Sequence, residues 1–172
     1  LPMLLTLGQL EARYARRPLH VGESSVLAVT LAPGAATRLD DLQLSVPAGV
    51  VIEVGPVRDR AGAAAAWRVR AAAPGRHELT VMLGGQAVAQ RSLAAGTGLP
   101  RTAETASTSW THALLYPGER QLAGSGPVLE TRLRYPARTT SYLGLELEWL
   151  VAFMLVSLAA GLALKNVLKV EI

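Results

Sequence analysis

The stretch from Arg76 to Leu93, RHELTVMLGGQAVAQRSL, is the part of the sequence that decides the fold. Its first half alternates polar and apolar residues, Gly84 and Gly85 follow, and a second run continues to Leu93. Alternation with a period of two is typical of a strand with one buried face. Glycine tolerates the positive φ angles of a two-residue hairpin turn. The sequence therefore predicts an antiparallel β-hairpin.

Shorter runs of the same kind precede this hairpin, and proline or glycine residues separate several of them. They lie at 25–31, 42–46, 50–54 and 66–70. Strands at spacings of roughly ten residues, with no helical periodicity between them, are typical of a sandwich. We therefore predict a mainly β fold, an immunoglobulin-like antiparallel β-sandwich over residues 19–95, with Trp67 in its core.

The segments around the sandwich have different compositions. Residues 1–18 begin with LPMLLTLGQL, which is apolar but too short to span a bilayer. This lead-in is the end of an earlier membrane helix, a processed signal sequence, or a packed strand or helix. Residues 96–109 are small and polar, and predict a linker. Residues 110–142 predict a small juxtamembrane β unit, in which 128–135 alternates like a strand.

The run WLVAFMLVSLAAGLAL, Trp149 to Leu164, carries no charge. A helix of that length spans about 24 Å, somewhat less than a hydrocarbon core of roughly 30 Å. The flanks extend the apolar face past Glu146 and Glu148 on one side and past Lys165 on the other. We therefore predict one C-terminal transmembrane helix over 143–168 and a cytoplasmic tail over 169–172. The alternative is a buried helix of a soluble domain.

Two groups of residues are candidates for contacts of this helix. Aromatic residues gather where a membrane-interface belt belongs, together with a lysine that reaches the headgroups: Trp110, Tyr116, Tyr135, Tyr142, Trp149 and Lys165. Small residues let a second helix approach closely, and Ser157, Ala160 and Gly161 form such a patch. The patch is either a helix-packing face or ordinary small-residue filler.

Composition and charge exclude several classes of function. Cysteine is absent, which excludes disulfides, zinc thiolates and cysteine nucleophiles. The net charge is +4, but the arginines are dispersed among apolar residues, so we expect no nucleic-acid binding. Both lysines, Lys165 and Lys169, follow the apolar run. Because positive charge tends to stay in the cytoplasm, we expect a periplasmic main domain on a bacterial inner (cytoplasmic) membrane, with one pass in this chain.

The sequence contains no recognisable catalytic arrangement. His20, His77 and His112 lie far apart, and we expect His77 to be a partly buried, hydrogen-bonded strand residue. Asp40-Asp41 offers too few oxygen ligands for a metal and predicts a turn. Gly96-Thr97-Gly98 lacks the strand and helix that flank a phosphate loop. We therefore expect no catalytic, cofactor-binding or metal residues, and no enzyme activity.

Both ends of the chain resemble a group of uncharacterised bacterial membrane proteins, in which an immunoglobulin-like extracytoplasmic domain is held between membrane helices. The matching residues are Leu115-Tyr116-Pro117-Gly118, Tyr135-Pro136 with Arg138, Gly144, Trp149, Phe153, Ser157-Leu158, Gly161 and Leu164-Lys165. Near the start, Pro2-Met3-Leu4, Arg17-Pro18-Leu19 and Gly22-Glu23 are similar as well. The resemblance implies a topology and no activity, and it implies that this chain is the back portion of a longer protein.

Together these patterns favour a non-catalytic, membrane-anchored accessory subunit. Its expected partners are the lipid bilayer and other membrane-protein subunits of a complex, which the sandwich and the helix contact. One alternative is an extracytoplasmic module that binds a glycan or a lipid, for which an exposed Trp67 is required. Another is an assembly factor for membrane proteins.

Overall fold

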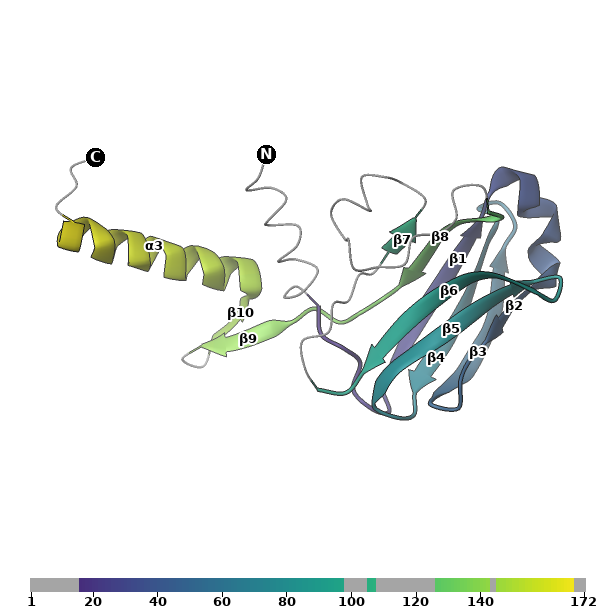
Figure 1. The fold of residues 1–172 in the computed structure, drawn as a ribbon, viewed down its shortest axis with the longest axis horizontal. Coiled ribbons are helices and arrows are strands. Elements are labelled where there is room, and N and C mark those ends of the chain that lie inside the picture. Colours follow the sequence, from purple (N-terminus) through teal and green to yellow (C-terminus); the bar gives the residue numbers. More distant parts are fainter. Residues whose placement is uncertain (1–15, 98–104, 108–125, 143–144, 169–172) are drawn as a thin grey trace. The chain divides into compact units, whose positions relative to one another are not determined.

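The structure is a computed structural model, and it describes residues 16–97, 105–107, 126–142 and 145–168 (Figure 1). The chain divides into two compact units, Leu1–Pro136 and Ala137–Ile172.

The first unit contains two antiparallel sheets within its described residues. One sheet has five strands in the order β3-β4-β1-β8-β7, and the other has three in the order β2-β5-β6 (Figure 1). The strands are β1 (Ser24–Leu31), β2 (Leu42–Ser45), β3 (Val50–Asp59), β4 (Ala64–Ala71), β5 (Gly75–Leu83), β6 (Gln86–Ala95), β7 (Thr105–Ser107) and β8 (Val128–Leu133). The prediction of a mainly β, antiparallel sandwich is confirmed.

The core lies between the two sheets. Alternate side chains of β1 are buried, and Leu27 and Val29 are fully inaccessible. Leu79 of β5 and Leu93 of β6 contribute equally buried side chains from the other sheet. Trp67 of β4 is 2% exposed, as expected of the core aromatic residue. The period of two in the sequence thus becomes one buried face on each sheet.

The predicted hairpin is β5 and β6. Leu83 lies opposite Gln86, and Gly84 and Gly85 have φ angles of 58° and 81°. Two positive φ angles in a two-residue loop match the twist of the flanking strands, and this requirement explains the Gly-Gly pair.

A 3-10 helix, η1 (Pro33–Asp41), connects β1 to β2, where the sequence predicted only a break and a turn. Pro33 lies in its first turn, where the missing N–H costs nothing. Ala35 and Leu39 are buried, so one side of this short helix covers the core. Two buried residues are too few to show helical periodicity in the sequence.

The expected boundaries between sandwich, linker and juxtamembrane unit need correction. β8 lies beside β1, with Leu27 opposite Leu133, and β7 pairs with β8. Residues 128–133 therefore belong to the sandwich, and 105–107 of the expected linker form a strand. Local alternation identified the strand at 128–133, but its pairing with β1, about a hundred residues earlier, depends on tertiary contacts.

The second unit contains β9 (Thr139–Tyr142), β10 (Leu145–Glu148) and α3 (Trp149–Leu168). β9 and β10 pair with each other, with Leu145 opposite Tyr142. The helix therefore begins at Trp149 and not at residue 143, because Leu-Glu-Leu-Glu alternates with the period of a strand. Over the part of the chain that the structure describes, no helix combines the length and apolarity needed to cross a membrane, so the predicted span over 143–168 is not found there.

Candidate functional site

Tyr135 is not placed as a membrane-interface residue. It is 3% exposed, and its hydroxyl accepts a hydrogen bond from the Ala94 N–H at 2.9 Å. The same hydroxyl donates to the Ser92 carbonyl at 3.3 Å. The ring therefore joins the end of β8 to β6, and the correction follows from burial: the apolar ring packs in the core while its hydroxyl finds backbone partners.

The other predicted contact residues fall into two groups. Trp110 and Tyr116 lie outside the described residues. Tyr142 ends β9, whereas Trp149 and Lys165 belong to α3. The predicted helix-packing residues Ser157, Ala160 and Gly161 are all exposed, and a Cβ added at Gly161 would meet no atom within 4 Å.

The helix α3 carries an unusual surface. Large apolar side chains are exposed over consecutive positions, with Val156 at 63%. The exposed members are Val151, Phe153, Met154, Leu155, Val156 and Leu158. Successive residues point about 100° apart around a helix, so these side chains cover its whole circumference.

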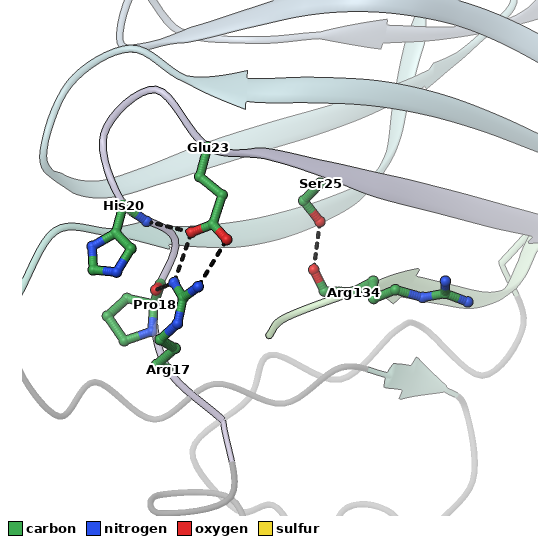
Figure 2. Close-up of polar contacts among 6 residues, drawn as sticks. All are labelled: Arg17, Pro18, His20, Glu23, Ser25 and Arg134. Carbon is green, nitrogen blue, oxygen red and sulfur yellow. Dashed lines mark hydrogen bonds and ion pairs between the residues drawn. The ribbon is translucent and has the colours of Figure 1, made fainter. Parts of the chain in front are cut away.

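A polar cluster joins the segment before β1 to the start of the sandwich (Figure 2). The Arg17 guanidinium donates two hydrogen bonds to the Glu23 carboxylate, at 2.7 and 2.9 Å, and the His20 backbone N–H donates a third at 2.8 Å. The Arg17 hydrogen bond lowers the pKa of the Glu23 carboxyl, and burial partly opposes this effect. The cluster fixes the entry of the chain into the sandwich and was not anticipated from the sequence.

A second polar cluster lies on the outward side of β3 and β4. Glu53 accepts a hydrogen bond from the Ser24 hydroxyl at 2.7 Å and one from the Arg70 guanidinium at 2.9 Å. Arg68 forms an ion pair with the same carboxylate at 3.2 Å. The Ser24 hydrogen bond is the largest cause of a lowered Glu53 pKa. One carboxylate therefore serves two arginines.

The described histidines and paired acids have structural contacts. His77 is partly buried, with its Nε2 atom 2.9 Å from the Ala73 carbonyl, as expected. The Asp40 carboxylate pairs with Arg60 at 3.1 Å and with Arg58 at 3.6 Å. Within the described residues, no three His, Cys, Asp or Glu side chains are arranged to hold a metal ion. His112 lies outside them.

An open depression of about 520 Å³ lies between η1, the β5–β6 hairpin and the segment before β8. Its residues are mainly small or apolar, including Ala32, Ala35, Leu83 and Pro127, with Arg38 as the charged member. Arg38 lies 3.9 Å from Asp41. The depression holds no pair of groups that could exchange a proton or attack a substrate.

The aromatic side chains described in the sandwich, Trp67 and Tyr135, are both buried. A stacking platform for a sugar ring requires an exposed aromatic face, and neither residue supplies one. Comparisons of the chain with protein-family models, with curated proteins and with solved structures find no match.

Proposed function

We propose that this chain is a non-catalytic, membrane-anchored accessory subunit of a bacterial membrane-protein complex. In this proposal α3 lies in an apolar environment of acyl chains and partner helices. The sandwich lies in the periplasm, since Lys165 and Lys169 follow the apolar run and positive charge favours the cytoplasmic side.

The exposed surface of α3 is the observation that carries this proposal. Residues 153–156 are Phe, Met, Leu and Val, and all four are between 45% and 65% exposed. At about 25 cal/mol per Å², each such side chain in water forgoes on the order of 1 kcal/mol of transfer free energy. A helix that is apolar all round is stable when lipid or other protein covers it.

We further propose that the sandwich is immunoglobulin-like. If β1 to β6 are taken as strands B to G, the orders β3-β4-β1 and β2-β5-β6 become D-E-B and C-F-G. Those are the neighbours expected in a constant-type immunoglobulin domain. β8 then takes the place of strand A beside strand B. The buried tryptophan lies on the E-equivalent strand β4 and not on strand C, which is a departure from that pattern.

The non-catalytic part of the proposal draws its support from how the described carboxylates are used. Glu23, Glu53, Asp40 and Glu130 each contact an arginine within 3.2 Å. The Arg17 hydrogen bond lowers the pKa of Glu23, and the Ser24 hydrogen bond is the largest cause of the lowered pKa of Glu53. A carboxyl whose pKa is lowered is a poor general acid.

The experiment is membrane extraction of the full chain. We expect the wild-type chain to stay with the membrane after alkaline carbonate treatment and to float with lipid in a density gradient. A double variant, Val151→Arg with Val156→Arg, should move to the supernatant, because each arginine places a charge on the apolar surface of α3 that must otherwise enter acyl chains.

The matched control carries the same two changes on exposed valines of the sandwich, Val21→Arg with Val57→Arg, and should stay in the membrane. An unchanged urea midpoint of the sandwich in each variant verifies folding. A wild-type chain that is monomeric and soluble without detergent would contradict membrane anchoring. Purification in mild detergent as an isolated monomer would contradict the role as a subunit.

A further inference from the structure

The two outward faces of the sandwich differ in character. The exposed large apolar residues on its strands all belong to the five-stranded sheet, whereas β2, β5 and β6 contribute none. The outward face of the three-stranded sheet is polar, with Gln43, Arg76, Glu78 and Gln90 exposed. A polar face is stable in water. The exposed apolar side chains that could contact a partner therefore lie on the outward face of the five-stranded sheet.

The strand register gathers apolar and cationic side chains on that face. Val51 lies opposite Arg70, Val54 opposite Arg68, and Val26 opposite Arg68 on the other side of β4. Directly opposed residues of an antiparallel pair share one face of the sheet. We call this surface the outer patch; its apolar members are Val26, Val51, Val54 and Val57.

The outer patch continues across β1 to β8. Arg132 lies opposite Ala28, and the Arg134 N–H bonds to the Val26 carbonyl. Ala28 and Ala66 lie opposite each other on this face and contribute only small side chains to it.

The charge of the outer patch is unbalanced. Four arginines, Arg68, Arg70, Arg132 and Arg134, share the face with three carboxylates, Glu53, Asp59 and Glu130. Glu53 serves Arg68 and Arg70 together, and Glu130 lies 3.0 Å from Arg132. Asp59, the last residue of β3, lies opposite Ala64, and its carboxylate accepts hydrogen bonds from the backbone N–H groups of Ala61 and Gly62. The patch is cationic, with valines among its arginines.

We propose that the outer patch docks a protein partner whose surface combines acidic and apolar side chains. This inference rests on the proposed function and specifies the chemistry of the partner. Arginine is enriched at protein interfaces because its planar guanidinium can donate two hydrogen bonds to one carboxylate. The exposed valines supply apolar contact area, which a nucleic acid or a headgroup layer does not match.

The area of the outer patch limits the affinity that we expect for its partner. Five strands spaced about 4.8 Å apart set the width of the face, and about eight residues per strand at about 3.4 Å each set its length. The face therefore measures roughly 500 Å². A stable complex covers about 800 Å² on each partner. The outer patch alone therefore predicts a weak, reversible contact that a shared membrane anchor strengthens by proximity.

The test uses the full chain in neutral lipid nanodiscs with methyl-labelled valine. Two synthetic peptides of equal length serve as probes, one alternating Glu and Val and the other alternating Lys and Val, together with vesicles containing anionic lipid. We expect the Glu-Val peptide to shift the methyl resonances of the outer-patch valines and to bind more weakly in about 0.5 M salt. Arg68→Glu and Arg132→Glu should each weaken binding about tenfold, whereas Arg76→Glu, on the polar face, should leave it unchanged.

Equal binding of the Lys-Val peptide, equal weakening by Arg76→Glu, or no binding of either peptide would overturn the proposal. Binding of anionic vesicles without peptide binding would assign the patch to headgroups and also overturn it. Peptide binding is measured apart from membrane extraction. Failure of the anchoring experiment with intact peptide binding therefore contradicts the proposed function alone.

Discussion

Glu23 is the carboxylate that ties the lead-in segment to the sandwich. Its partner Arg17 comes from outside the strands, and the Arg17 backbone N–H also bonds to the Pro136 carbonyl at 3.1 Å. Arg17 thus holds the entry of the chain into the sandwich through its side chain, and the segment after β8 through its backbone N–H. Loss of the ion pair should lower the stability of the whole sandwich, since the entering and the leaving segments both contact Arg17.

We predict that Glu23→Gln lowers the free energy of unfolding by about 1 kcal/mol at neutral pH. The native pKa of Glu23 lies below its ordinary value, so the stabilisation is present above the ordinary pKa and is lost as the pH falls through the native pKa. Urea denaturation of both proteins at about pH 7 and about pH 3 measures the difference, which should shrink at the lower pH.

The control for this measurement is Glu78→Gln. Glu78 is exposed on the polar face of β5, and among the described residues its carboxylate forms no ion pair. Its substitution should change stability equally little at both pH values. A Glu23→Gln deficit that is the same at both pH values would show that the carboxylate charge is not what stabilises the entry.

The strand β8 belongs to the five-stranded sheet of the sandwich, whereas the sequence assigned it to a separate juxtamembrane unit. It supplies Leu133 to the core at 0% exposure, while Leu129 of the same strand is 45% exposed. β8 lies between β1 and β7, so the sandwich needs a strand from beyond residue 125 to complete its larger sheet.

We predict that Leu133→Ala lowers the free energy of unfolding by about 2–5 kcal/mol, since it removes buried apolar volume and leaves a cavity. Leu129→Ala, the same change on the exposed side of the strand, should alter stability by less than about 0.5 kcal/mol. Urea denaturation followed by intrinsic tryptophan fluorescence, to which the buried Trp67 contributes, measures both. Equal effects of the two substitutions would contradict the placement of β8 in the core.

The division into two units is the property of the whole molecule that matters most for the proposed function. The sandwich has its own core, and β9, β10 and α3 belong to the second unit. A folded domain and an apolar helix can therefore act separately, one on a partner surface and the other in an apolar environment.

We predict that a chain ending at Pro136 unfolds cooperatively with the same urea midpoint as the full chain, both measured in the same detergent. The reason is that, among the residues whose burial the structure describes, every core residue precedes Ala137. A broadened transition or a lower midpoint in the shortened chain would show that the second unit contributes to the stability of the sandwich.

The sequence by itself determined the class of fold, because alternation, proline and glycine act locally. The Gly84-Gly85 hairpin, the strands around it and the burial of Trp67 all follow from residues near one another in the chain. It also marked the apolar run of α3, but it placed the start of the helix too early, at residue 143.

Only the tertiary structure decided which strands are neighbours and which faces are covered. The pairing of β1 with β8, the burial of Tyr135 against β6, and the gathering of valines and arginines on one face join residues far apart in the chain. Gly55 is a further example, since a Cβ at that position would meet Trp67 of the neighbouring strand at 2.7 Å. Local periodicity sets where a side chain points along its own strand, whereas packing between distant segments sets what it meets there.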